Sequence, residues 1–274
     1  MSEITQTAAG RGTEMIDAET KGNDMDAVIS HILAECVRAV EAVVKISRVS
    51  TTDKEFSFQN WFGDRLKAIS LNFDEPSRNA YPDFRLVDYP LGFETKGLGF
   101  PGREANYDCN SQVPTGCHNG RQIYYVFGRY PASTMNEAEY PVYDLVICHG
   151  SFLNADTGYV HKNKNLKGFG SYGDLIIRDR KMYIAPTPYA LTSGTERQVS
   201  LIVPEDFHPE TTLRLRGKVV RTEADKLIRG YTFNLKTHKL APVCESNPNA
   251  GKQHAFSVYQ TASSTGPEVS LRQK

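Results

Sequence analysis

The spacing of apolar residues predicts two amphipathic helices near the start of the chain. Over residues 25–49, apolar side chains recur every three or four positions, as along the buried side of a helix, and Asn23 or Asp24 is a suitable N-cap. The same spacing predicts a second helix over residues 53–71. Residues 1–23 have almost no apolar periodicity and are rich in acids, which is typical of a flexible acidic lead.

Beyond residue 80 the pattern changes to short apolar runs separated by turns that contain Pro, Gly or Asp, which is typical of β-strands. Strands are predicted at residues 84–87, 91–95, 123–127, 143–148, 174–177, 182–185, 199–203, 213–220 and 230–235. Residues 261–274 are rich in Ser, Thr and Gly, which predicts a disordered tail. The order of elements favours an α/β domain with an N-terminal helical pair and a β-rich C-terminal half.

Composition supports a folded domain: 39% of the residues are hydrophobic and 23% are charged. No window approaches eighteen consecutive apolar residues, and the first residues lack the basic and apolar stretches of a secretory signal. The five cysteines are odd in number and widely spaced, which indicates reduced thiols rather than a disulfide framework. We therefore expect a soluble, cytoplasmic protein with no membrane association.

Charge is balanced overall, with 32 basic and 32 acidic residues, so the net charge indicates no nucleic-acid or membrane partner. The distribution is uneven, however. Residues 1–26 contain six acids and two bases, whereas residues 160–182 and 213–229 each contain six bases and two acids. Each basic segment is either a solvated exterior or a surface that contacts phosphates.

Residues 81–96 contain the strongest concentration of chemistry in the chain. They are expected to form a strand, a tight turn and a second strand, and Glu94 and Lys96 must share a face of the second strand. An antiparallel hairpin brings Asp83 beside that pair. Carboxylate oxygens are the ligands that Mg²⁺ prefers, and a site at a strand edge leaves room for water and a substrate phosphate. The pattern therefore predicts phosphodiester hydrolysis.

Here the sequence resembles the PD-(D/E)xK nuclease superfamily, whose motif takes the form Pro82-Asp83, ten residues, then Glu94-Thr95-Lys96. The resemblance implies that Asp83 and Glu94 bind Mg²⁺ and that the main-chain carbonyl of Thr95 adds a ligand. It also implies that Lys96 positions the attacking water. The fold implied is a restriction-endonuclease-like mixed central sheet flanked by helices.

The flanking sequence extends the resemblance. The helix upstream is similar to the first helix of the family, which implies that Gln59, or alternatively Glu55, faces the site; a solvent-facing glutamine is the other interpretation. Residues 108–114 are similar to a stretch that follows the Glu-x-Lys strand in several type II restriction endonucleases. The similarity covers residues 53–150, about a third of the chain. Residues 24–260 are then a single domain, with DNA recognition in the β-rich part over 151–260.

With DNA as the substrate, the first basic segment becomes a candidate DNA-binding surface. Residues 161–170 are too polar and glycine-rich to pack, so Lys162, Lys164 and Lys167 are available for phosphates. Arg178 and Arg180 lie at a predicted hairpin turn. A two-stranded ribbon fits the major groove, where arginine reads guanine.

Other motifs support different chemistry less well. The runs 97–102 and 168–173 match G-x-G-x-x-G but neither opens a predicted helix, so we expect no nucleotide cofactor. Cys109, Cys117 and Cys148 are too far apart to resemble a zinc site. No G-x-S-x-G sequence is present to indicate an acyl-enzyme hydrolase.

The sequence thus predicts a Mg²⁺-dependent, sequence-specific double-stranded DNA endonuclease resembling type II restriction enzymes. Cutting both strands of a palindromic site requires two symmetry-related sites, which implies a homodimer. Two alternatives remain at this stage: a repair or junction-processing nuclease with the same core, and a non-catalytic DNA-binding protein.

Overall fold

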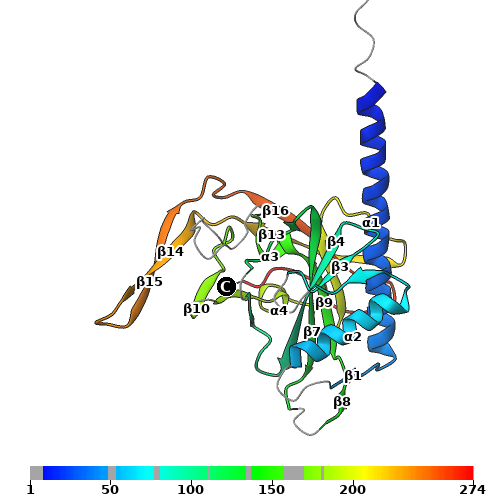
Figure 1. Ribbon diagram of the computed structural model, residues 1–274, viewed down its shortest axis with the longest axis horizontal. Helices are drawn as coiled ribbons and strands as arrows, with labels where there is room; N and C mark the ends of the chain where they lie inside the picture. The colour runs from blue at the N-terminus through cyan, green and yellow to red at the C-terminus, as the bar shows by residue number, and fades with distance from the viewer. Residues whose placement is uncertain are drawn as a thin grey trace, which may run out of the picture.

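The structure, a computed structural model, describes residues 9–48, 54–76, 81–109, 112–133, 137–156, 170–179 and 182–273. Its centre is a nine-stranded mixed β-sheet (Figure 1). The predicted α/β class is confirmed in this coarse sense, with a large sheet and few helices. None of the helices in the described ranges has the length and apolar character needed to span a bilayer.

The helices are short except for the first two. Their bounds are α1 Ala9–Glu41, α2 Lys54–Ala68, α3 Gly150–Leu153 and α4 Pro188–Leu191. The strands are β1 Ile46–Ser47, β2 Phe73–Asp74, β3 Phe84–Leu86, β4 Leu91–Phe100, β5 Asn106–Asp108, β6 Cys117–His118, β7 Arg121–Pro131, β8 Glu139–Tyr140, β9 Asp144–His149, β10 Ile176–Asp179, β11 Met182–Pro186, β12 Val199–Pro204, β13 Leu213–Thr222, β14 Lys226–Asn234, β15 Lys239–Ser246 and β16 Gln253–Thr261.

The large sheet has the strand order β13-β16-β12-β9-β7-β4-β3-β2, with β6 paired to β7. Strand β4 runs parallel to β7, and β9 runs parallel to β12, whereas the other pairs are antiparallel. Smaller sheets are formed by β10-β11-β5, by β1-β8 and by β14-β15. All nine predicted strands overlap observed strands, because their apolar runs and turns are local signals.

Two hydrophobic clusters lie on opposite faces of the sheet. On the first face, α1 and α2 pack against Phe93, Tyr124 and Val126. The second face carries Tyr125, Phe127 and the other members of the second cluster. Side chains alternate along a strand, so the two clusters use alternating residues of β7. The second face is covered by α3, α4, β5, β11 and the C-terminal residues rather than by long helices.

Helix α1 differs from its predicted bounds at both ends. It begins at Ala9, so residues 9–23, expected to be part of a flexible lead, belong to the helix; Ala, Glu and Met in this stretch favour helix without any apolar periodicity. It ends at Glu41 instead of 49, because Val43 adopts a left-handed backbone with φ of 54°. The Val44 N–H then reaches back to the Ala39 carbonyl at 2.9 Å and closes the helix.

The C-terminal residues also differ from expectation. The sequence predicts disorder from 261 onward, but residues 262–273 have a defined path and Val269 is buried in the second cluster. The Val269 N–H donates to the Arg216 carbonyl, and Leu271 forms a bridge with Thr192. Polar residues are compatible with this path because their hydroxyls bond other side chains: Ser264 donates to Gln260, and Ser270 bonds Ser193.

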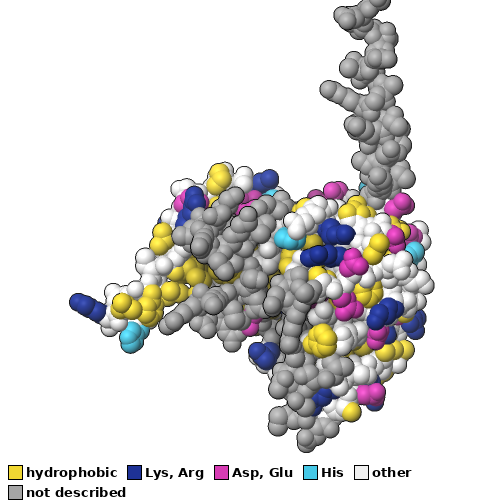
Figure 2. Space-filling model, viewed as in Figure 1, with side chains coloured by type: hydrophobic (Ala, Val, Ile, Leu, Met, Phe, Trp, Pro, Cys, Tyr) yellow, Lys and Arg dark blue, Asp and Glu magenta, His cyan; other side chains and the backbone are white. Residues whose placement is uncertain are grey.

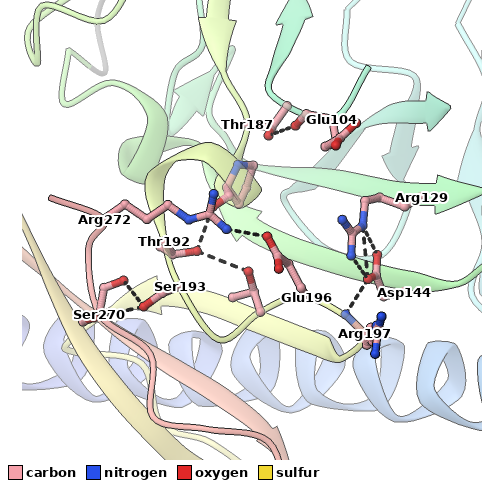
Figure 3. A network of polar contacts seen from close by, with 12 residues as sticks. Glu104, Arg129, Asp144, Thr187, Thr192, Ser193, Glu196, Arg197, Ser270 and Arg272 are labelled. Carbon is pink, nitrogen blue, oxygen red and sulfur yellow. Dashed lines mark hydrogen bonds and ion pairs between the residues drawn. The ribbon is translucent and has the colours of Figure 1, made fainter. Parts of the chain in front are cut away.

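A network of buried polar side chains lies on the second face of the sheet, near the end of β7 (Figure 3). Asp144, which is completely buried, accepts hydrogen bonds from the Arg129 guanidinium, the Tyr189 hydroxyl and the Arg197 N–H. Arg129 also lies between the rings of Phe100 and Tyr189, 4.3 and 4.4 Å from their centroids. With every polar atom of Asp144 engaged, the network joins β7, β9, α4 and the loop before β12.

Candidate active site

The hairpin of β3 and β4 brings the acidic residues of the motif together, as its sequence predicts. Phe84 pairs with Phe93 and Arg85 with Gly92 in antiparallel register. Extending this register by one residue puts Asp83 opposite Glu94, just beyond the end of β3. The short turn between the strands therefore determines which residues lie opposite each other.

Asp83 is anchored to the edge of β4 by Thr95. One carboxylate oxygen, Oδ2, accepts the Thr95 N–H at 2.7 Å and the Thr95 hydroxyl at 2.8 Å. Thr95 itself is buried, so this carboxylate has a defined orientation. Since the N–H and C=O of one residue point to the same side of a strand, the Thr95 carbonyl lies on the Asp83 side of β4.

Glu94 and Lys96 form a buried ion pair. The Lys96 Nζ lies 2.8 Å from the Glu94 Oε1, and the two side chains are only 10% and 14% exposed, respectively. Their spacing of two residues puts both on one face, as expected. An ion pair this buried is weak evidence for stability, because removing two charges from water is costly.

Helix α2 covers the other face of this strand. The ring of Phe58 fills the space above Gly128, where an added Cβ would lie 2.1 Å from it, and Phe58 Cβ is close to Gly97 in the same way. Residues 93 and 97 thus face α2, while Glu94 and Lys96 face the second cluster. The interpretation in which α2 presents Gln59 to that pair is not supported. Gln59 is half-buried, and Glu55 lies where no side chains are described.

Aromatic side chains surround the Glu94–Lys96 pair. Tyr81 and Tyr125 join through their hydroxyls at 2.9 Å, the Tyr81 ring packs on His118, and the Tyr107 ring packs on Tyr125. Burial raises the pKa of the Tyr81 hydroxyl well above its ordinary value, and the nearby Glu94 carboxylate raises this pKa further. The phenols therefore remain neutral hydrogen-bonding groups in a low-dielectric wall.

The sequence pattern did not identify this aromatic wall. Tyr125 lies beside Glu94 because the parallel register of β4 and β7 pairs these two residues, a contact that depends on long-range strand pairing. Tyr81 had a local signal, since it stands two residues before Asp83 in the same hairpin. The residues that contact the Tyr81 ring, however, come from β6 and β7, so they are known only from the tertiary structure.

The segment that follows the motif lies on the same face of the sheet. Cys109 and Val113 are buried in the second cluster, while Asn110 and Ser111 are outside the described residues. Burial raises the pKa of the Cys109 thiol to about 12, so it is protonated at neutral pH and a poor metal ligand. Over the described residues, no group of three or more His, Cys, Asp and Glu side chains could hold a metal ion.

The oxygen donors at the hairpin are of the type that Mg²⁺ takes. This ion is commonly bound by one or two carboxylates, with waters and substrate phosphates completing its octahedron. Asp83, Glu94 and the Thr95 carbonyl supply that number of oxygen donors at one strand edge. A zinc or calcium cage would need more protein ligands or softer ones than these.

The predicted DNA-binding residues are only partly described. Lys162, Lys164, Lys167 and Arg180 lie outside the described residues. Arg178 lies on β10, whose antiparallel pairing with β11 forms the hairpin expected here. Strand β11 pairs in turn with β5, so this hairpin is joined to the segment that follows the motif strand.

Acidic partners neutralise part of the second basic segment. Arg221 is buried, pairs with Asp174, and lies 4.2 Å over the ring of Tyr172. On the surface, Lys218 lies 2.7 Å from a carboxylate oxygen of Glu205. These contacts favour structural roles over phosphate binding for Arg221 and Lys218.

The arrangement combines two carboxylates, a main-chain carbonyl and a lysine at one strand edge, against a wall of neutral phenols. Such a site can hold a hard divalent cation and orient a nucleophilic water. Neither a scan against protein-family models nor a search of the curated proteins finds a match to this chain.

Proposed function

We propose that this protein is a Mg²⁺-dependent DNA endonuclease of the PD-(D/E)xK type. One observation carries the proposal: the β3–β4 hairpin holds Asp83 at Thr95 and sets it opposite the buried Glu94–Lys96 pair. A Glu–Lys pair buried at a strand edge has little value for stability. Its use in phosphodiester hydrolysis would be direct, because the carboxylates would hold a cation at the phosphate and the ammonium would orient the attacking water.

Each residue has a distinct role in this proposal. Asp83 and Glu94 would hold Mg²⁺ together with the Thr95 carbonyl, and the ion supplies charge neutralisation at the scissile phosphate. The Thr95 N–H and hydroxyl hold the Asp83 carboxylate in place. Lys96 hydrogen-bonds and orients the attacking water. The Tyr81–Tyr125 pair limits water on that side of Lys96 and so strengthens the electrostatic effect of the ammonium.

A sequence-specific, type II restriction activity on double-stranded DNA is the specific form of this proposal. The mixed sheet with α1 and α2 on one face supports this form only coarsely, because the other face lacks the long flanking helices expected of a restriction-endonuclease-like fold. Cleavage of both strands at a palindrome requires two copies of the site, so we propose a homodimer.

The test is incubation of the purified protein with plasmid DNA in the presence and absence of Mg²⁺. We expect discrete fragments that require the metal. Asp83→Ala and Glu94→Gln should each reduce cleavage at least about a thousandfold, because loss of a metal ligand costs several kcal/mol of transition-state stabilisation.

The matched control is Asp88→Asn, which removes an exposed carboxylate from the same hairpin. It should cleave at the parental rate. Random nicking without fragments would favour a structure-directed nuclease, and an absence of cleavage with any divalent ion would contradict the proposal.

A further inference from the structure

Arg85 of β3 lies on the same side of the hairpin as the Glu94–Lys96 pair. It stands directly opposite Gly92 in the antiparallel register, and residues opposite each other share a face. A Cβ added at Gly92 would lie 2.9 Å from Ile123 of the second cluster, so this face is the one toward that cluster. Glu94 follows Gly92 by two residues and therefore shares the face. The hairpin thus carries a guanidinium on the same side as the candidate active site.

Tyr81 connects Arg85 to that site. Its main-chain carbonyl accepts a hydrogen bond from the Arg85 Nη2 at 2.9 Å. Its hydroxyl lies close enough to the ion pair for both charges to act on its pKa, which the Glu94 carboxylate raises and the Lys96 ammonium lowers. One residue therefore contacts the guanidinium through its main chain and lies near the ion pair through its ring.

The guanidinium of Arg85 is anchored but not neutralised. Among the described residues it forms no ion pair, and the Tyr81 carbonyl is its one hydrogen-bond acceptor. Other arginines of this sheet differ, because Arg121 donates to three main-chain carbonyls and Arg129 pairs with Asp144. Arg85 is half-buried, and a guanidinium has several N–H donors, most of which are left here for water or a ligand. A partly desolvated cation of this kind favours an anionic ligand.

The charge of the site indicates which anion fits. Asp83 and Glu94 carry two negative charges and Lys96 and Arg85 carry two positive charges, so the four side chains sum to zero. His118 adds no positive charge at neutral pH, because burial and the Arg85 charge both lower its pKa. A divalent cation held by the carboxylates would therefore leave an excess of positive charge. The planar guanidinium matches two oxygens of a phosphate, so a phosphodiester backbone suits both the charge and the geometry.

The visible surface of the body has no broad basic face over its described residues. Figure 2 shows Lys and Arg side chains interspersed with Asp and Glu side chains there. Phosphate contacts close to the site then depend on individual cations rather than on a general positive field. Arg85 is such a cation.

We propose that Arg85 binds a phosphate of the substrate DNA strand and positions that strand beside the candidate metal site. The inference rests on the proposed nuclease function and adds a backbone contact to it. Arg85 is a positioning residue: held by the Tyr81 carbonyl, it restricts where the phosphates lie relative to Asp83 and Glu94. A phosphate contact of this kind contributes affinity without sequence preference.

The experiment measures the affinity of the purified protein for duplex DNA in EDTA, where no cleavage occurs, over a range of salt concentrations. Arg85→Gln should reduce the slope of log K against log salt by about one, the effect of one lost phosphate contact. Arg85→Lys keeps the charge and should retain the parental slope. With Mg²⁺ present, Arg85→Gln should also lower the single-turnover cleavage rate at least about tenfold, because the strand is less well positioned.

The matched control is Lys67→Gln, which removes an exposed positive charge from α2 on the opposite face of the sheet. It should bind and cleave DNA like the parent, with the parental salt slope. A purely structural Arg85, needed only for its hydrogen bond to Tyr81, would change the stability of the variants without changing the salt slope.

Two results would overturn the inference: an Arg85→Gln variant with the parental slope, or an Arg85→Lys variant that loses as much slope as Arg85→Gln. Failure of the nuclease proposal is separable. A parent whose DNA binding depends on Arg85 in this way, but which cleaves DNA with no divalent ion, contradicts the nuclease proposal alone. A parent that cleaves DNA while Arg85→Gln keeps the parental slope contradicts the Arg85 inference alone, and a parent that binds no duplex DNA contradicts both.

Discussion

The Lys96–Glu94 pair allows a quantitative prediction that separates a structural ion pair from a catalytic one. With 2.8 Å between Nζ and Oε1, their attraction is about 6 kcal/mol at an effective dielectric of about 20. Most of this attraction offsets the cost of burying two charges. Lys96→Met removes the ammonium but leaves the Glu94 carboxylate buried, which should lower the free energy of unfolding by about 3–5 kcal/mol.

The double variant Glu94→Gln, Lys96→Met should recover that loss. Both charges are gone, and a neutral amide beside an apolar chain of similar length avoids the desolvation cost. Replacing a buried ion pair in this way is commonly neutral or stabilising by about 1–4 kcal/mol. We therefore expect the double variant to be at least as stable as the parent, because no charge remains buried. It should have no nuclease activity, because the proposed metal ligand and the proposed water-orienting lysine are both absent.

Urea unfolding followed by tryptophan fluorescence measures this directly, since Trp61 is the only tryptophan and is buried in the first hydrophobic cluster. Cleavage of plasmid DNA is measured on the same samples. If Lys96→Met unfolds within about 0.5 kcal/mol of the parent, the pair is not buried as described. If the double variant still cuts DNA, the proposed site is wrong.

Three further predictions test other parts of the fold. Burial lowers the pKa of His149 to about 4. Between about pH 4 and 6.5 this imidazole is therefore protonated in the unfolded state but neutral in the folded state. The free energy of unfolding should be highest above about pH 6.5 and fall by up to about 3 kcal/mol toward pH 4. His149→Asn keeps an acceptor for the Ser151 N–H and should flatten this pH dependence in urea unfolding; an unchanged slope would contradict it. Val43→Gly removes left-handed strain at a position that is 57% exposed and should raise stability by about 1 kcal/mol, measured by thermal melting. Gly128→Ala should destabilise by at least about 1–3 kcal/mol because its Cβ would overlap Phe58, and Phe58→Leu in the same chain should restore part of the loss.

Local patterns in the sequence determined most of the secondary structure and the core of the candidate site. Strand alternation placed Glu94 and Lys96 on one face, and the Pro- and Gly-containing turn brought Asp83 to their side; the pairing of β3 with β4 agrees with both. These features depend on residues within about fifteen positions of one another, so no knowledge of distant contacts is needed.

Tertiary structure alone decided which distant residues meet. Tyr125 lies beside Glu94 through the β4–β7 register, and Phe58 packs helix α2, which carries Gln59, onto the opposite face of the sheet. Likewise, Arg221, basic in the sequence, becomes an internal ion-pair partner only when β13 approaches Asp174. Periodicity identifies the buried side of each element, but the partner against which that side is buried depends on packing over the whole chain.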